Sequence, residues 1–205
     1  MKLWTIWVDE VGRGAWAWPV VAASIFWAWR CPIKGILWDS KKLSSSEREK
    51  TYQEIVQLSL QWKLYYGVWI IENTVIDVVG IREANRLAML QSLQRIQNTE
   101  CKIYSKENRL MIDGRDNYQF DIVWLPAPKY IIRWDSKVKQ IMAASILAKV
   151  IRDNLMRDFE KEFPGYGFVQ HKGYGTRLHQ KTLQKLGVSE IHRRSYKPIV
   201  VLLSK

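Results

Sequence analysis

The segment IMAASILAKVI, residues 141–151, constrains the fold of this 205-residue chain more than any other. It lies inside a stretch that predicts one long helix from about residue 136 to 163, and it is apolar on nearly all sides. A helix of this kind has to be buried on more than one side. The small residues Ala143, Ala144 and Ser145 allow a neighbouring layer to approach closely. We therefore expect this helix to pack against a β-sheet.

Short apolar segments predict the strands of that sheet. They lie at residues 3–8, 20–26, 63–71, 109–112 and 130–133. The early strands are joined by short loops, which favours antiparallel pairing. Further helices are predicted at 44–60, where Ser44 is the N-cap, at 81–96 and at 177–186. The chain begins with consecutive strands and continues with strands that alternate with helices. This order indicates a mixed α/β sheet.

The composition limits the partners and the compartment. A net charge of +12 favours a polyanion, either nucleic acid or an anionic membrane surface, although a soluble protein with a basic surface would also fit. Cys31 and Cys101 are far apart, which argues against a zinc ribbon or a disulfide scaffold and favours a reducing compartment. The longest apolar run, 15–29, is shorter than the roughly 18–20 residues of a membrane span. We expect a cytoplasmic protein without a membrane segment.

Four acids stand at the ends of predicted strands. Asp9 and Glu10 follow the first strand, Asp113 follows the fourth and Asp135 follows the fifth. Ligand sites form at the carboxyl edge of such sheets, and clustered carboxylates suit hard cations such as Mg²⁺ or Mn²⁺. Two such ions about 3.5–4 Å apart can catalyse in-line displacement at phosphorus. The alternative is that these are ordinary turn and capping acids, since Asp-Gly at 113–114 is a common turn pair.

Other catalytic chemistries find no support in the sequence. His171, His179 and His192 lie in the last quarter of the chain without a GxSxG nucleophile motif near them. The chain has no phosphate-binding Walker loop, and the histidines lack the spacing of metal ligands. We interpret each histidine as a surface or phosphate-facing residue.

Six motifs in order resemble ribonuclease HII over essentially the whole chain. They are VDEVGRG at 8–14, DSKKLS at 39–44, MIDG at 111–114, DSKVKQIMAASILAKVIRD at 135–153, HKGYGT at 171–176 and IHRRSY at 191–196. The resemblance implies a ribonuclease H-like mixed sheet flanked by helices, with a C-terminal helical extension. It implies a catalytic domain over 1–160 and a basic, substrate-binding extension over 161–205, built as one continuous unit.

The resemblance also implies the reaction. It is cleavage of the RNA strand of RNA–DNA hybrids, and nicking on the 5′ side of ribonucleotides embedded in duplex DNA, as in ribonucleotide excision repair. Asp9, Glu10, Asp113 and Asp135 would bind two divalent ions, Mg²⁺ or Mn²⁺, and water would leave 5′-phosphate and 3′-hydroxyl ends. We expect a monomer without an obligate protein partner. The sibling HIII type carries an extra N-terminal domain, and only eight residues precede Asp9, which disfavours that type.

The same resemblance assigns substrate contacts. Gly12, Arg13 and Gly14 match the loop that reads the ribose 2′-hydroxyl, the group that separates RNA from DNA; the two glycines also suit a tight turn. Tyr174 matches the tyrosine that stacks on the sugar beyond the cleaved junction. Phosphate contacts are expected from Lys41, Lys42, Lys172, Arg193 and Arg194, with a solvated basic face as the alternative for the last three.

Tryptophan replaces small residues of the family pattern. Trp7 and Trp18 stand at glycine positions, and Trp134 stands where the family has Gly or Ala, in a chain with 11 Trp and 11 Gly. Overpacking costs about 1–3 kcal/mol per site. We hypothesise that several of these tryptophans, Trp62 among the candidates, are UGA codons that encode glycine in the source organism. The alternatives are compensated tryptophans, or a catalytically impaired nucleic-acid-binding protein on the same fold.

Overall fold

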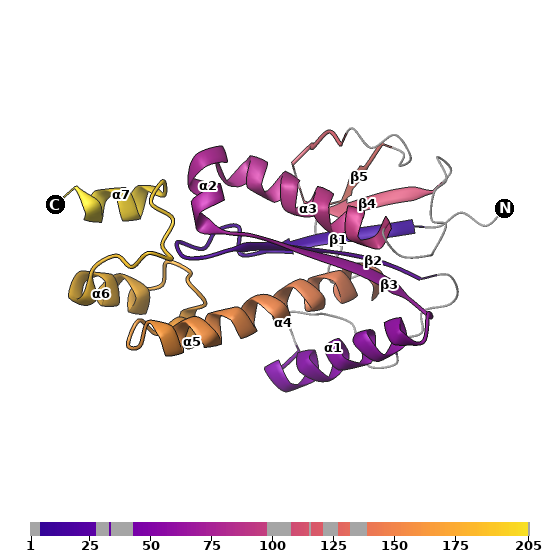
Figure 1. Cartoon of the computed structure of the whole chain (residues 1–205), viewed down its shortest axis with the longest axis horizontal. Coiled ribbons are helices and arrows are strands. Elements are labelled where there is room, and N and C mark those ends of the chain that lie inside the picture. The colour runs from indigo at the N-terminus through magenta and orange to yellow at the C-terminus, as the bar shows by residue number, and fades with distance from the viewer. Residues whose placement is uncertain are drawn as a thin grey trace.

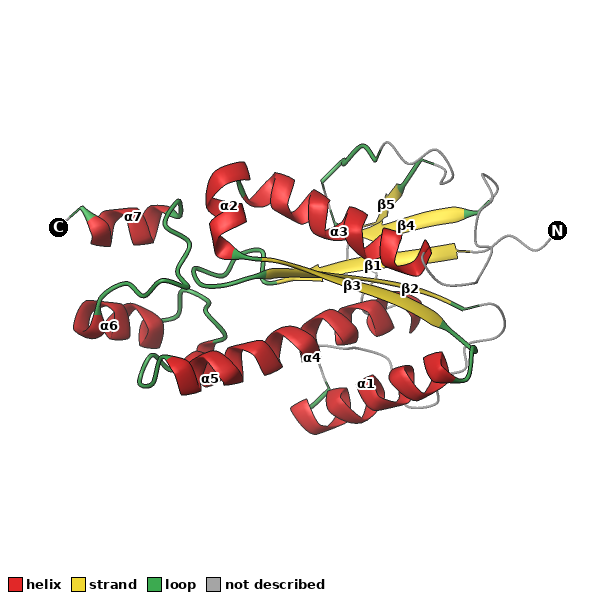
Figure 2. Cartoon of the chain, viewed as in Figure 1, coloured by secondary structure: helices red, strands yellow, loops and turns green. Residues whose placement is uncertain are grey.

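The computed structural model describes residues 5–27, 33, 43–97, 108–114, 116–120, 127–131 and 139–204. The strands of the sheet are β1 Thr5–Val11, β2 Val20–Phe26, β3 Tyr65–Ile71, β4 Arg109–Asp113 and β5 Lys129–Ile131. The helices are α1 Ser45–Leu60, α2 Asn73–Val79, α3 Ile81–Gln97, α4 Lys139–Glu162, α5 Phe168–His171, α6 Arg177–Leu186 and α7 Lys197–Leu203. Figure 2 shows these strands in yellow and these helices in red.

The strands form one mixed sheet in the order β3-β2-β1-β4-β5. The β1–β2 and β2–β3 pairs are antiparallel, whereas β1–β4 and β4–β5 are parallel. This confirms the predicted mixed α/β sheet and its antiparallel first half. The parallel pairs bring the carboxyl ends of β1, β4 and β5 to a common edge of the sheet.

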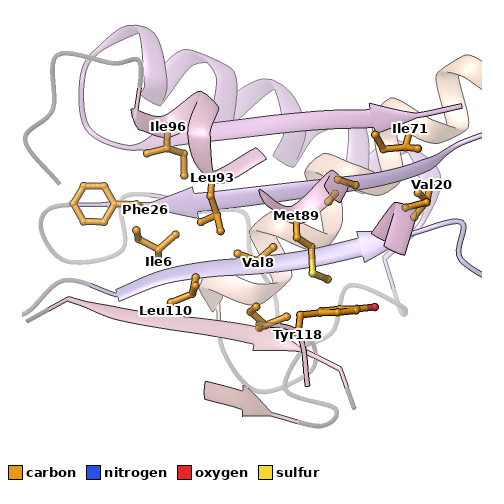
Figure 3. Close-up of a cluster of buried hydrophobic side chains, with 14 of the residues drawn as sticks. Ile6, Val8, Val20, Phe26, Ile71, Met89, Leu93, Ile96, Leu110 and Tyr118 are labelled. Atoms are coloured by element: carbon orange, nitrogen blue, oxygen red, sulfur yellow. The ribbon is translucent and has the colours of Figure 1, made fainter. Parts of the chain in front are cut away.

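Helices cover both faces of the sheet (Figure 1). Helix α3 packs on β1, β2 and β3 from one side, and α4 packs on β1 and β2 from the other, with α1 against α4. On the α3 side, Ile6 and Val8 of β1 meet Met89 and Leu93 of α3 (Figure 3). Gly67 of β3 lets α3 come close, because a Cβ there would collide with the carbonyl oxygen of Ser92.

The buried long helix confirms the prediction from its apolar composition. Ala143 and Ala144 of α4 are fully buried in the cluster that fills the other side of the sheet, together with Ile141 and Leu147. Small side chains therefore do bring α4 close to β1 and β2. The described part of the helix begins at Lys139, and its expected first turn at 136–138 lies outside the described residues.

Some expected boundaries differ from the structure. Strand β1 runs to Val11 rather than ending at Val8, because Asp9, Glu10 and Val11 continue the ladder with β2. The sequence interpretation also missed α2, α5 and α7, which have 7, 4 and 7 residues. Helices this short show too few turns for an apolar period to be visible.

The C-terminal helices α5, α6 and α7 lie together at one end of the molecule (Figure 1). A third apolar cluster joins them to the rest: Phe168, Leu183 and Ile199 pack with Met156 of α4 and with Ala17 from the β1–β2 loop. The assignment of 161–205 as an extension stays a prediction. No helix in the described parts of the chain combines the length and the apolarity that a bilayer span requires.

Candidate active site

The first two acids lie on β1, at the centre of the sheet. Successive residues of a strand point to opposite faces. Asp9 is 8% exposed and accepts hydrogen bonds from Ser145 of α4 and from the backbone N–H of Glu10 (2.8 Å). Glu10 points to the α3 side, where the Asn85 side chain hydrogen-bonds to it. Groups from both helical layers therefore fix the two carboxylates.

The third acid, Asp113, ends the neighbouring parallel strand. Val8 of β1 is in register with Ile112 of β4, so Asp113 lies beside Asp9 at the carboxyl edge. The charge of Asp113 acts on both Asp9 and Glu10. Asp113 is in turn in register with Ile131 of β5. The structure thus brings together three of the four predicted acids, while Asp135, beyond β5, lies outside the described residues.

The charges of the acids favour a bound cation. Burial, together with the charges of Glu10 and Asp113, raises the pKa of Asp9 well above its ordinary value. Burial, opposed by Arg13 and reinforced by Asp113, raises the pKa of Glu10 to about 7. The Oε2 atom of Glu10 is buried, and within the described residues it has no hydrogen-bond partner. A divalent ion would satisfy this oxygen and offset the repulsion.

The donor set fits a hard cation, although the described residues do not complete a site. Asp9, Glu10 and Asp113 offer only carboxylate oxygens, which suit Mg²⁺ or Mn²⁺. Over the ranges that the structure describes, no three acid, histidine or cysteine side chains converge closely enough to hold one ion. Asp135, the fourth expected ligand, lies outside those ranges.

A further acid, Asp116, was missed by the sequence interpretation. The Arg13 guanidinium forms an ion pair with Asp116, and the Tyr118 hydroxyl donates to the same carboxylate (2.9 Å). Asn85, which also contacts Glu10, donates to the Tyr118 hydroxyl (3.1 Å). A chain of polar contacts therefore connects Arg13 to the acids. The available signal was the position of Asp116, three residues after Asp113.

The Gly12–Gly14 loop follows β1 directly and folds tightly. Gly12 has φ 91°, and a Cβ there would collide with the side chain of Arg152 and lie 2.6 Å from the carbonyl oxygen of Pro19. Glycine is therefore required at position 12, both for its backbone angle and for the close approach. Arg152 of α4 is fully buried and donates to the carbonyl oxygens of Pro19 (2.9 Å) and Lys172 (2.9 Å).

Arg193 differs from its expected role. It was expected to face a phosphate, but its side chain is fully buried under the Gly12–Gly14 loop. Its guanidinium donates to the carbonyl oxygens of Gly12 (2.7 Å), Arg13 (2.9 Å) and Trp18 (2.7 Å). These carbonyl groups need donors in a buried place, and the guanidinium supplies several in one plane. In this structure Arg193, like Arg152, holds the loop in shape; the sequence interpretation did not identify either role.

Tyr174 lies next to the same loop. It forms a β-bridge with Ala15, and the amide of Trp16 donates to the carbonyl oxygen of Gly173 (2.7 Å). Gly173 has φ 76°, and a Cβ there would lie 2.8 Å from the carbonyl oxygen of Ala17. Two segments more than 150 residues apart in sequence are thus joined at the backbone.

The predicted phosphate contacts fall in different places. Lys172 precedes Gly173 and is partly buried, while Arg194 is exposed and its backbone amide donates to Asp77 (2.8 Å). Lys41 and Lys42 lie outside the described residues. The structure therefore brings Tyr174 and the segment that contains Lys172 to the Gly12–Gly14 loop, which directly follows Asp9 and Glu10.

This site sits on a known architecture. The chain is similar to the ribonuclease H2 of Pyrococcus horikoshii OT3, with a TM-score of 0.76 and 20% identity over 98% of each chain. It is similar to the RNase HII of Archaeoglobus fulgidus in its complex with PCNA, with a TM-score of 0.73 and 21% identity over 95% of this chain and 96% of the other. Bst-RNase HIII with Mn²⁺ gives a TM-score of 0.62 and 16% identity over 98% of this chain and 70% of the other.

The fold and the carboxylates at its edge define a ribonuclease H-like nuclease. A sequence model of the ribonuclease HII family matches residues 6–199, which is nearly the whole chain. The chain belongs to the ribonuclease HII family and is a ribonuclease H-type hydrolase.

Proposed function

We propose that the protein is an endonuclease that cleaves the RNA strand of RNA–DNA hybrids and nicks duplex DNA on the 5′ side of an embedded ribonucleotide. One observation carries the proposal: Asp9, Glu10 and Asp113 share a sheet edge with the Gly12–Gly14 loop that leaves β1. Carboxylates that can hold cations thus lie next to a loop that is suited to contact a sugar.

Divalent ions are part of the proposal. Asp9, Glu10, Asp113 and Asp135 would hold two ions, and the presence of Mn²⁺ in Bst-RNase HIII supports this expectation. Such ions, when bound, would supply water activation and stabilisation of the leaving 3′-oxygen, and the expected products have 5′-phosphate and 3′-hydroxyl ends. Ser145 and the Glu10 amide orient the Asp9 carboxylate, and Asn85 orients Glu10.

The loop is shaped to read a ribose. Arg193 pins the carbonyl oxygens of Gly12 and Arg13 on the inner side of the loop. In a trans peptide the N–H points away from the carbonyl oxygen. The amides of Arg13 and Gly14 are therefore directed to the side opposite Arg193, where a 2′-hydroxyl could accept or donate hydrogen bonds. Tyr174, joined to Ala15, would contact the sugar on the far side of the cleaved bond.

Basic residues would supply sequence-independent affinity. A chain with a net charge of +12 attracts a polyphosphate over a long range. Lys41, Lys42, Lys172 and Arg194 are the proposed phosphate contacts, and Arg193 acts through the loop instead. Two predictions stay open to test: a cytoplasmic location and a role in ribonucleotide repair. The prediction of a monomer without an obligate partner also stays one, since the Archaeoglobus relative was solved with PCNA.

Cleavage of a duplex with one embedded ribonucleotide tests the proposal. In Mg²⁺ or Mn²⁺ we expect one nick on the 5′ side of the ribonucleotide, and in EDTA no nick. Asp113→Asn should lower the cleavage rate by about 100-fold or more while it spares duplex binding, because removal of even an outer partner of a metal ligand costs about 10–100-fold.

An all-DNA duplex of the same sequence is the substrate control, and Glu49→Gln at a partly exposed position of α1 is the protein control. Binding of the ribonucleotide duplex without metal-dependent cleavage would instead support a catalytically impaired binding protein. The family match and the three grouped acids do not favour that alternative.

A further inference from the structure

The three histidines of the chain form one buried cluster behind the substrate loops. His171 ends α5, His179 lies in α6 and His192 precedes Arg193, and their exposed fractions are 4%, 0% and 0%. The rings of His171 and His179 stack with centroids 4.1 Å apart. The Nε2 atoms of His179 and His192 are 3.0 Å apart. This corrects the expectation of surface or phosphate-facing histidines.

The hydrogen-bond partners assign the protons of all three rings. His179 Nδ1 lies 3.0 Å from the carbonyl oxygen of Tyr174, which can only accept, so Nδ1 carries the proton and Nε2 accepts. His192 Nδ1 accepts from the amide of Ser189 (3.1 Å), so its Nε2–H donates to His179. His171 Nδ1 likewise accepts from the Gly173 amide (3.1 Å), and its Nε2–H donates to the carbonyl oxygen of Tyr166 (2.8 Å).

All six ring nitrogens therefore form hydrogen bonds inside the protein, and this pattern requires three neutral rings. Burial lowers the pKa of His179 to about 3 and that of His192 to about 4, which agrees with neutral rings. A nitrogen that already holds or accepts a proton from the protein is not available to bind a metal or to attack a substrate. The cluster is suited to positioning rather than to chemistry.

The cluster connects the two segments that would read the substrate. Its side-chain relay runs from Ser189 through His192 and His179 to the carbonyl oxygen of Tyr174. The backbone also connects the same segments. His192 forms a β-bridge with Ala17, and Ala17 belongs to the loop whose Ala15 pairs with Tyr174. The histidine relay thus acts beside the Ala15–Tyr174 bridge and the Arg152 guanidinium, which also connects the two segments, in holding Tyr174 at the Gly12–Gly14 loop.

We propose that His179 and His192 are positioning residues that fix Tyr174 against the Gly12–Gly14 loop and so set the preference for an RNA–DNA junction over a uniform RNA–DNA hybrid. The inference rests on the proposed function and adds residues that do not touch the substrate. The relay holds the tyrosine backbone, and the Arg152 guanidinium lies over the tyrosine ring, 5.3 Å from its centroid.

Two amide variants of His179 test the inference, each matching one of the two ring nitrogens. An Asn amide nitrogen occupies the place of Nδ1, so H179N keeps a donor for the Tyr174 carbonyl; a Gln amide occupies the place of Nε2, so H179Q loses that donor. We measure kcat and KM for a single-ribonucleotide duplex and for a uniform RNA–DNA hybrid. H179Q should lower the ratio of the two kcat/KM values by about tenfold, since small misplacements reduce rates strongly. H179N should restore most of the ratio.

A double variant separates positioning from stability. In the Y174A background, H179Q should leave the ratio unchanged, because coupled residues are not additive. Equal losses on both substrates, or a lower Tm with an unchanged ratio, would overturn the inference. His192 gives an independent pair if H179Q does not fold: H192N loses the donor to His179, whereas H192Q keeps it. Failure of the wild type to cleave either substrate would refute the proposed function itself.

Discussion

At the scale of single residues, two tryptophans occupy backbone positions that suit glycine. Trp62 follows the last turn of α1 with φ 58°, and the amides of Trp62 and Lys63 donate to Ser59 and Leu58 (3.0 Å each). This is a Schellman motif, in which glycine is usual at the position of Trp62. Trp18 has φ 53° directly before Pro19, where extended backbone is preferred.

The structure therefore supports the glycine hypothesis at Trp62 and Trp18 but not at Trp7. Trp18 also buries its indole Nε1 without a hydrogen-bond partner in the described part of the chain. Trp7, by contrast, lies in the regular strand β1 and packs with Trp27 in an apolar cluster, so nothing in its backbone requires glycine. Trp134 lies outside the described residues.

The substitution W62G tests the strain directly. A left-handed backbone costs an L residue roughly 1–2 kcal/mol, and Trp62 is 62% exposed, so little packing is lost. We expect W62G to raise the free energy of unfolding by about 1 kcal/mol in a denaturant titration, and W62A, which keeps the strain, to give no such gain. Equal values for W62G and W62A would contradict this. UGG codons in the gene, or tryptophan at these positions in the intact mass of the native protein, would refute the hypothesis.

At the scale of elements, the substrate loops are held by groups that lie outside them. Arg152 on α4 and Arg193 before α7 donate to the carbonyl groups of the β1–β2 loop, and His179 on α6 donates to Tyr174. These donors come from α4, from α6 and from the segment before α7. The motifs GRG and HKGYGT identify the loops, but their partners become visible only when the chain is folded.

The histidine cluster makes the folded state sensitive to acid. Histidine in the unfolded chain has a pKa of about 6.5, whereas burial lowers the pKa of His179 to about 3 and of His192 to about 4. Between these values the two rings bind more protons in the unfolded chain, so their contribution to the free energy of unfolding falls as the pH falls from about 6.5 toward 4. Glu160 and Lys172 also act on the cluster, through His171.

Denaturant titrations at pH 7 and pH 5 check this dependence. Asp9 and Glu10, whose pKa values are raised in the folded state, act in the opposite direction between these pH values, in the wild type and in the variant alike. H179N, which removes one titrating ring, should therefore lose less stability than the wild type when the pH is lowered from 7 to 5. Glu49→Gln, at a partly exposed position of α1, serves as the matched control and should keep the wild-type difference. The same difference in H179N and the wild type would show that other groups cause the acid sensitivity.

At the scale of the whole molecule, the C-terminal helices complete the substrate side of the sheet. Asn73 of α2 donates to the carbonyl oxygens of Glu190 (2.9 Å) and His192 (3.2 Å), and Asp77 of α2 accepts from the amides of Arg194 and Ser195. Ala17 and Met156 pack with Phe168 and Leu183. These contacts join the C-terminal segment to α2, α4 and the β1–β2 loop, and one continuous unit stays the prediction.

Truncation after residue 160 tests that organisation. It would remove the partners of Ala17 and Met156 and leave the carbonyl groups of Gly12 and Arg13 without the Arg193 guanidinium. Loss of buried donors costs about 1–3 kcal/mol per group left unsatisfied. We expect the truncated chain to lose the cooperative thermal transition of the full chain, or to melt at a much lower Tm. A truncated chain that melts as cooperatively, and at the same Tm, would show an independent domain.

The sequence by itself determined the elements whose period is long enough to read. It predicted the buried α4 from its all-round apolar surface, the positions of the strands along the chain and Asp113 at the end of β4, whereas Asp9 and Glu10 lie inside β1 rather than after it. Tertiary structure decided which carboxylates share an edge, because the parallel register of Val8 with Ile112 places Asp113 beside Asp9. It also decided that Arg193 and the histidines lie inside, since burial depends on contacts between segments far apart in the chain, and a local pattern of residues does not record them.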